Sequence, residues 1–361
     1  MAEDSFLAAP PPFLPDDVCP PPASILLDPY GYLSDRTNAT TADCLTKGGK
    51  RIMVTFWVAR PPNGSYFTFC SPDLEISEVS DVPCILNTED DLVLLRFPIC
   101  RPCLNLNPRH NDYFVYQAGD KDKPPSLELI PSPPAMSCSD NQVGLLPCRT
   151  HNMYFIAILQ PVLSREWLYK LYLYSSKTKT WTTKLMHLNQ IVVYTIPSKV
   201  ITIGGEHGSM GWVELWRGIL ICDVLLDNHK LRYISLPPAE IHEVSRLRGP
   251  AFRFRDIIAC DGCIKLLKMY RYIGPGGVTK GWQVATYVWM DSSSSWAEDC
   301  SIKFTEDLVL PCLWDAKPIK QLTFKGDYSG YPALSLHDGD LASSWTDRIF
   351  WTKKHWLLLS I

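Results

Sequence analysis

The sequence lacks a long hydrophobic run and a recognisable targeting segment. Its longest clean apolar stretch, "MYFIAILQPVL", is too short to cross a bilayer and contains Pro161. The opening "MAEDSFLAAPPPF" has neither the basic start and apolar core of a secretory signal peptide nor the basic character of an organellar transit peptide. We therefore expect an intracellular protein, cytoplasmic or nuclear, that does not act at a membrane.

The chain also lacks a strong net charge. Its 35 basic and 38 acidic side chains leave a formal charge of −3, which argues against a general binder of nucleic acid. The 13 cysteines are odd in number and scattered, as expected for reduced, mostly buried thiols in a reducing compartment. In such a compartment the glycosylation sequons at Asn38 and Asn63 carry little meaning.

Signatures of catalytic, metal and cofactor sites are missing from the sequence. The eight histidines form no HExxH or HxH pattern, no GxSxG elbow occurs, and the glycine clusters match no phosphate-binding or dinucleotide-binding loop. The CxxC pairs Cys100/Cys103 and Cys260/Cys263 are 263 − 100 = 163 positions apart, whereas structural zinc sites usually close over a much shorter span. The second pair brackets an Asp-Gly hairpin dipeptide, which explains its spacing without a metal. We predict no catalytic residue, no metal and no cofactor.

Helical periodicity is scarce as well, whereas strand patterns are abundant. Thirty prolines, 12 tryptophans and 16 tyrosines favour many short strands joined by tight loops. Residues 1–24, with seven prolines between Pro10 and Pro22, are predicted to be a disordered tail. From Ile25 onward the pattern is strand, turn, strand, so we expect residues 25–361 to form a single all-β domain.

The stretch "GWVELWRGILICDVL", residues 211–225, predicts two strands joined by a reversal at Arg217-Gly218. "LRYISLPP" adds a third strand, and three antiparallel strands make a meander. Because "ILICDVL" is apolar on both faces, we expect it inside a stack of sheets, with Trp212 and Trp216 packed between neighbouring sheets. Asp223 interrupts this strand and is predicted to accept hydrogen bonds from amides of the following turn.

Similar meanders recur along the chain at a regular spacing. In three of them a pair of aromatic or apolar residues flanks a turn at an offset of seven: Tyr174/Trp181, Val224/Leu231 and Trp289/Trp296. The second members of these pairs are 50 and 65 residues apart, near or above the ~40–50 residues of a propeller blade. We therefore predict a β-propeller-like repeat of antiparallel meander sheets, with about six blades and a ring that need not be fully closed. A two-sheet assembly is the alternative.

The motif "GWVELWRGILICDVL…LRYISLPP" resembles the signature of a plant family expanded in grasses and catalogued as a domain of unknown function. "ILLDPYGYLSDRTNATTA", "VTFWVARPPNGSYFTFCSPD" and "EDDLVLLR" resemble its N-terminal part, and "RDIIACDGCIKLLKM" its C-terminal part, so the resemblance covers residues 24–315. The family is similar to the propeller-like domains found behind F-boxes, which implies a propeller fold. It implies no catalytic residue, and residues 1–24 are too short to supply an F-box. The C-terminal "SSWTDRIFWTKKHWLLLSI" matches the family poorly, as a divergent or truncated last blade would.

The most basic segment, "RLRGPAFRFR", holds four arginines within ten residues: Arg246, Arg248, Arg253 and Arg255. If the segment is a strand, Arg253 and Arg255 share one face and Phe252 and Phe254 the other. This is either a half-buried strand with its charged face in water or a guanidinium patch that grips an acidic or phosphorylated segment of a protein partner.

Two loops complete the candidate residues. His207 lies in "GGEHGSMG", where the glycines predict an exposed loop, so His207 is either solvated or part of a binding face. Glu89, Asp90 and Asp91 precede an apolar strand and are predicted to form a solvated turn.

These features favour a non-enzymatic interaction module that binds a protein partner through a face made of loops. One alternative is a hydrolase with carboxylates in a central propeller cleft, which requires acidic groups that converge and have raised pKa values. The other is a decayed family copy with no retained partner. The sequence predicts no particular oligomeric state.

Overall fold

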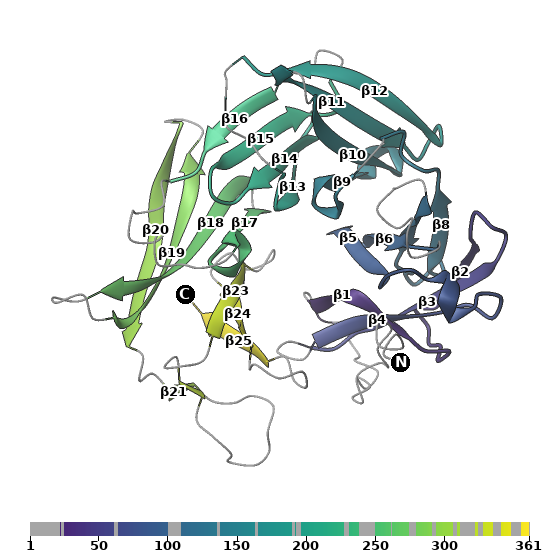
Figure 1. Ribbon diagram of the computed structural model, residues 1–361, viewed down its shortest axis with the longest axis horizontal. Coiled ribbons are helices and arrows are strands. Elements are labelled where there is room, and N and C mark those ends of the chain that lie inside the picture. Colours follow the sequence, from purple (N-terminus) through teal and green to yellow (C-terminus); the bar gives the residue numbers. More distant parts are fainter. Residues whose placement is uncertain are drawn as a thin grey trace. The chain divides into compact units, whose positions relative to one another are not determined.

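The computed structural model describes residues 22, 25–60, 64–99, 110–135, 138–162, 165–189, 192, 196–226, 231–237, 250–260, 262–273, 279–290, 294–305, 309–310, 322–323, 328–334, 341–347 and 355–360. Within these ranges the chain forms strands and short 3-10 turns without any α-helix, which confirms the all-β prediction (Figure 1). Apart from Pro22, the predicted tail over 1–24 lies outside the described residues.

The chain divides into two compact units. The first comprises Met1–Trp212 and Cys222–Arg232, and the second comprises Val213–Ile221 and Tyr233–Ile361. A single domain over 25–361 therefore stays a prediction.

The first unit begins with an eight-stranded sheet of order β2-β3-β4-β1-β5-β6-β7-β8. Its strands are β1 (Leu26–Leu33), β2 (Ala42–Leu45), β3 (Arg51–Trp57), β4 (Gly64–Cys70), β5 (Cys84–Glu89), β6 (Leu92–Phe97), β7 (Asp112–Gln117) and β8 (Ser126–Ile130). Strands β1 and β4 pair in parallel, and β1 joins β5 through the pair Tyr30 and Cys84.

The two ends of this sheet come close together, so it is nearly closed and barrel-like. The ring centroids of Phe56 in β3 and Tyr116 in β7 are 4.5 Å apart, and the Tyr116 hydroxyl donates to the Thr40 carbonyl at 2.8 Å. At the start of β7, Asp112 pairs with Lys47 at 3.3 Å. The enclosed core consists of apolar side chains from both ends of the sheet, including the fully buried Phe114.

Three four-stranded antiparallel sheets follow, and in each of them the strands lie in chain order from one edge to the other. They are β9 (Val143–Cys148), β10 (Met153–Val162), β11 (Arg165–Ser175) and β12 (Thr180–His187); β13 (Lys199–Gly204), β14 (Ser209–Glu214), β15 (Gly218–Asp223) and β16 (Leu231–Ser235); and β17 (Arg255–Cys260), β18 (Cys263–Ile273), β19 (Thr279–Met290) and β20 (Ser295–Thr305). The predicted meanders are therefore confirmed.

Shorter strands end the described chain. They are β21 (Val309–Leu310) and β22 (Leu322–Thr323), which pair with each other, and β23 (Tyr328–Leu334), β24 (Leu341–Asp347) and β25 (His355–Ser360), which form a three-stranded sheet. The amide of Leu334 in β23 donates to the Asp256 carboxylate of β17 at 3.0 Å.

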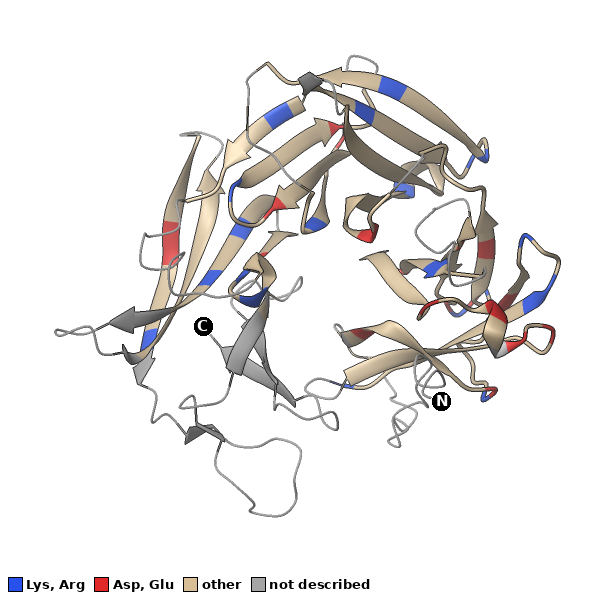
Figure 2. Ribbon diagram, in the orientation of Figure 1, with Lys and Arg blue, Asp and Glu red and all other residues tan. Residues whose placement is uncertain are grey.

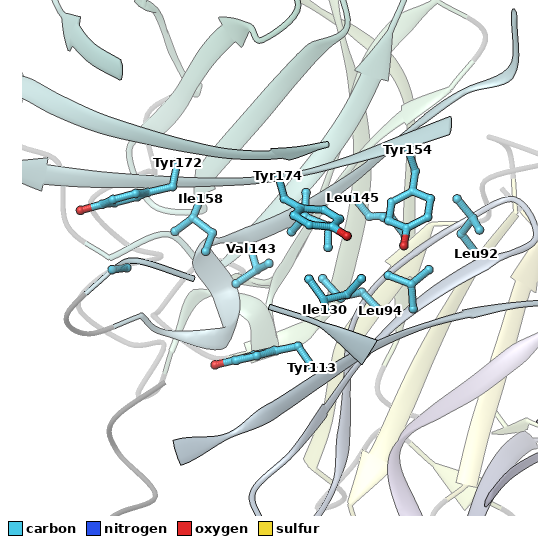
Figure 3. Close-up of a cluster of buried hydrophobic side chains, with 13 residues drawn as sticks. Leu92, Leu94, Tyr113, Ile130, Val143, Leu145, Tyr154, Ile158, Tyr172 and Tyr174 are labelled. Carbon is cyan, nitrogen blue, oxygen red and sulfur yellow. The ribbon is translucent and has the colours of Figure 1, made fainter. Parts of the chain in front are cut away.

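An apolar core lies between β6–β8 and β9–β11 in the first unit. Leu94 and Ile130 point toward Leu145 and Tyr174, and all four are fully buried (Figure 3). Burial of such side chains stabilises a fold by roughly 1.5–3 kcal/mol each. This core packs the faces of two successive meanders against each other.

The offset of seven found in the sequence is a cross-strand register. Tyr174 pairs with Trp181 across the β11–β12 turn, and Trp289 pairs with Trp296 across the β19–β20 turn. Their ring centroids are 5.4 Å and 5.5 Å apart, respectively. An offset of seven across a short turn thus places two rings on the same face of a sheet.

The quoted motif at 211–225 forms β14, a turn and β15, with Gly218 as the first residue of β15 rather than part of the reversal. Trp212 is fully buried, and its indole N–H donates to the Gln142 carbonyl before β9 at 2.9 Å. Trp216 packs under the guanidinium of Arg255, 4.8 Å from the ring centroid. Both tryptophans therefore contact neighbouring sheets, as predicted.

Candidate binding surface

The structure changes the interpretation of the arginine-rich segment. Ala251–Arg253 form a 3-10 turn that starts after Pro250, and β17 begins only at Arg255. The amide of Arg253 donates to the Pro250 carbonyl at 3.1 Å, and the amide of Phe254 donates to the Ala251 carbonyl at 2.9 Å. The prediction that Arg253 and Arg255 share the solvent-facing side of a strand is therefore wrong, because the backbone turns between them.

Arg255 is a core residue with a relative exposure of 2%. Its guanidinium lies over Trp216 and donates to the Leu215 carbonyl at 3.2 Å. Both contacts satisfy a buried cation, so little of this side chain is left for a partner. Arg253 is half-buried next to the exposed Phe252, whereas Arg246 and Arg248 lie outside the described residues. Partner binding by these arginines stays a prediction.

A second polar region is built by three turns of the first unit, residues 90–91, 149–152 and 205–208. We call it the hairpin-turn surface. They connect β5 to β6, β9 to β10 and β13 to β14, which are corresponding places in three successive meanders. Asp90 and Asn152 adopt left-handed backbone conformations, with φ of 53° and 47°, as Asp and Asn do more readily than most residues in tight turns.

Ion pairs join the first two turns. Arg149 donates to the Asp90 carboxylate at 2.8 Å and to the Asp91 carboxylate, which also accepts from Gln117 at 3.1 Å. These hydrogen bonds lower the pKa of Asp91 and outweigh its partial burial. Because the Arg149 side chain is 54% exposed, the pairs contribute little stability but orient the charged groups of both turns.

The third turn packs against the second meander. A β-carbon added at Gly208, which has φ of +60°, would lie 2.7 Å from side-chain atoms of Leu146 and Leu225. In the same region the Thr202 hydroxyl donates to the Leu145 carbonyl at 2.7 Å. His207 is exposed at the tip of this turn, which confirms the predicted exposed loop. The three turns are therefore held next to one another.

Glu89, the last residue of β5, differs from its neighbours in the first turn. Burial raises the pKa of Glu89 from 4.5 to about 7, and Asp90 adds to this shift, while Thr202 and Lys199 oppose it. The predicted solvated turn is thus confirmed for the exposed Asp90, whereas Glu89 is a partly buried residue of β5. The sequence carries no sign of this difference, because Thr202 and Lys199 reach Glu89 from a strand more than a hundred positions away.

Sequence reasoning also missed a thiol–imidazole contact in the second turn. The Cys148 sulfur lies 3.5 Å from His151 Nδ1, and the Thr150 hydroxyl lies 3.0 Å from the same nitrogen. The i, i+3 spacing of Cys148 and His151 was the available signal. Side chains in one short turn can meet in this way without forming a catalytic pair.

A further group of charges surrounds Arg96 in β6. Its guanidinium lies 3.1 Å from Asp140 and 3.5 Å from Asp81. Burial raises the pKa of Asp140, and it raises the pKa of Cys84 to about 12. Because one arginine neutralises both carboxylates, this group resembles a structural ion-pair network more than an acid–base pair.

Asp223 has a structural environment. Its carboxylate accepts a hydrogen bond from the Ser209 hydroxyl in β14 and lies 4.0 Å from the Arg232 guanidinium in β16. The predicted acceptor role is confirmed, and these two partners are side chains of neighbouring strands.

Charge of both signs is interspersed along the described strands (Figure 2). Within the described ranges no group of three or more His, Cys, Asp or Glu side chains is placed to hold a metal ion. No helix in this part of the chain has the length and apolar character needed to span a membrane.

Residues 212–342 match the family model described as "Protein of unknown function (DUF1618)". This confirms, for that part of the chain, the predicted resemblance to a domain of unknown function. Among solved structures, the endo-arabinase from Bacteroides thetaiotaomicron VPI-5482 is 12% identical, with 80% of this chain and 95% of that chain covered and a TM-score of 0.27. A likeness this weak carries no argument about fold or activity. No curated protein matches the chain.

Proposed function

We propose that this chain is a β-propeller-like scaffold that binds a protein partner through the hairpin-turn surface. The propeller part of the proposal is supported by the chain-order meanders and by a repeated contact between them. The Trp181 indole donates to the Pro131 carbonyl after β8, and the Trp296 indole donates to the Ser235 carbonyl that ends β16, both at 2.8 Å. A contact repeated at equivalent positions is typical of blades that stack on their neighbours. Kinship with a grass-expanded family and with the domains behind F-boxes belongs to the same proposal.

The binding part rests on one observation, the Arg149 bridge to Asp90 and Asp91. It joins turns from two meanders, so that exposed His151 keeps a defined place beside them. Rigid sheets that present polar turns are suited to recognition, since the turns lose little conformational freedom on binding. A surface of mixed charge favours a polar protein segment over nucleic acid or lipid.

The test is affinity purification of the tagged chain from its source tissue, followed by mass spectrometry. We compare the wild type with a His151→Glu/His207→Glu variant and with Lys177→Glu as a control, because Lys177 is exposed in the β11–β12 turn. A partner retained by the control and lost by the histidine variant supports the proposal. Recovery of no specific partner by the wild type contradicts it and favours a decayed copy.

An acidic or phosphorylated partner segment remains a second form of the same proposal, through Arg246, Arg248 and Arg253. It is tested with Arg253→Glu alone, because a charge reversal at the buried Arg255 would disturb the core. If Arg253→Glu loses the partner and the histidine variant keeps it, the binding site lies at the arginine segment and not at the hairpin-turn surface.

A hydrolase is the second candidate function, and Glu89 is the observation that favours it. A carboxyl group with a pKa of about 7 is matched to general acid catalysis at neutral pH. Against it, Asp90 and Asp91 on the same turn are paired with Arg149. A panel of chromogenic glycosides and esters tests this: turnover that Glu89→Gln abolishes supports the hydrolase, and absence of turnover rejects it.

A further inference from the structure

Cys260 and Cys263 face each other across the two-residue turn between β17 and β18. The two residues are Cα partners in the antiparallel register of these strands. Residues directly opposite in an antiparallel pair project their side chains to the same face of the sheet. Both pack on one apolar cluster, in which Cys260 is buried and Cys263 is partly buried. The Cys263 thiol donates to the Cys260 carbonyl at 3.1 Å, so it already points back across the turn.

This register suits a disulfide. Opposed residues of an antiparallel pair have Cα atoms about 4.5–5.5 Å apart, within the roughly 4.4–6.8 Å that disulfides span. Cβ atoms of such pairs are about 4.5–5.5 Å apart, slightly more than most disulfides allow. The bond therefore needs only a small closure of the turn.

The described residue of this turn, Gly262, leaves open space beside the pair. Gly262 is exposed, has φ of +73°, and a β-carbon added there would meet nothing within 4 Å.

We propose that Cys260 and Cys263 are a redox-active dithiol that a low-molecular-weight disulfide, such as oxidised glutathione, converts reversibly to a disulfide. A thiolate of the pair attacks the glutathione disulfide, forms a mixed disulfide and releases one glutathione. The second thiolate then attacks the protein sulfur of that mixed disulfide and releases the other glutathione. Two protein thiols are oxidised, one glutathione disulfide is reduced to two thiols, and the two protons end on those thiols.

Oxidation would act on the packing beside the turn. The Cys263 thiol would no longer donate to the Cys260 carbonyl, and both sulfurs would shift within the cluster that includes Leu334 of β23. The site is independent of the hairpin-turn surface, although it occupies the corresponding turn of its own meander.

The experiment equilibrates the native protein in glutathione buffers with a rising oxidised share, followed by acid quenching and alkylation. Trypsin cleaves after Arg255 and Lys265, so one peptide, residues 256–265, carries both cysteines. We expect this peptide to lose two hydrogen atoms, to escape alkylation and to be restored by a dithiol reductant. The native chain should reach half oxidation at an oxidised share about tenfold lower than the urea-unfolded chain, because the hairpin pre-positions both sulfurs.

Two cysteine variants serve as controls. Cys300→Ser should leave this oxidation unchanged, whereas Cys263→Ser should leave Cys260 as a thiol or a glutathione adduct. Full alkylation of the peptide in the most oxidising buffer would overturn the proposal. Equal oxidation of the native and unfolded chains would overturn it as well, since the fold would then contribute nothing.

Discussion

At the scale of single residues, two buried cationic side chains are part of the core of the second unit. Arg255 and Lys268 are cross-strand partners with exposures of 2% and 5%. The guanidinium of Arg255 lies over Trp216, and the ammonium of Lys268 lies 5.4 Å and 5.7 Å from the ring centroids of Tyr287 and Tyr270. Aromatic faces attract cations, and this attraction is larger where water is excluded.

Arg255→Ala should lower the stability of the chain by about 2–4 kcal/mol, because it removes a charged hydrogen bond, a cation–π contact and buried packing. Urea denaturation followed by tryptophan fluorescence measures the change. Arg253→Ala is the matched control and should have the smaller effect. Equal effects of the two substitutions would contradict the role assigned to the Trp216 contact.

The raised pKa of Glu89 makes stability depend on pH. The folded chain retains the Glu89 proton up to about pH 7, whereas the unfolded chain loses it near 4.5. The stabilising contribution is therefore fully present below about 4.5 and declines as pH rises through 7, by at most about 3 kcal/mol. Glu89→Gln should remove this part of the decline in urea midpoints measured between about pH 5 and pH 8. Glu206→Gln, on the third turn of the same surface, is the control, and equal slopes for wild type and Glu89→Gln would contradict the assignment.

At the scale of elements, the sheets are joined by indole hydrogen bonds at equivalent positions. Trp181 in β12 and Trp296 in β20 are each the second residue of the last strand of a meander. Each donates to a carbonyl at the end of an earlier sheet and contacts an aromatic ring on its own sheet. The same residue thus fixes the turn beside it and the neighbouring sheet.

Trp181→Phe and Trp296→Phe should each lower the free energy of unfolding by about 1 kcal/mol or somewhat more, since phenylalanine keeps a ring contact but leaves a carbonyl without its donor. Chemical denaturation gives the values, with Trp167→Phe as the control because Trp167 is 46% exposed. A loss of stability in only one of the two variants would contradict the equivalence of the two indole contacts.

Gly218 begins β15 where no side chain fits. A β-carbon there would lie 2.4 Å from the Tyr233 ring and 2.5 Å from the Ile234 carbonyl oxygen. Gly218→Ala should destabilise the chain by about 1–3 kcal/mol through overpacking. Gly48→Ala is the comparison, because its added carbon would meet only Thr46 at an ordinary 3.7 Å. Equal melting temperatures of the two variants would contradict overpacking at Gly218.

At the scale of the whole molecule, the arrangement of strands within sheets carries the functional proposal. The three four-stranded sheets keep chain order, whereas the first eight strands form one sheet in which β1 pairs in parallel with β4. Strand β1 comes from the start of the chain and pairs with β4, the last strand of the β2–β4 meander. This pairing is compatible with the proposed propeller. In each meander this order places the turn after the first strand at a corresponding position, which is where the hairpin-turn surface and the Cys260/Cys263 turn occur.

The sequence by itself determined the all-β class, the meanders, the cross-strand aromatic pairs and the exposed turn at His207. These features depend on local alternation, turn residues and short offsets, and such patterns act over a few positions of the chain. Only the tertiary structure decided that Arg255 is buried against Trp216 and that Glu89 is desolvated beside Thr202. Desolvation and pairing are set by groups brought from distant positions in the sequence, so no local pattern distinguishes a buried charge from a solvated one.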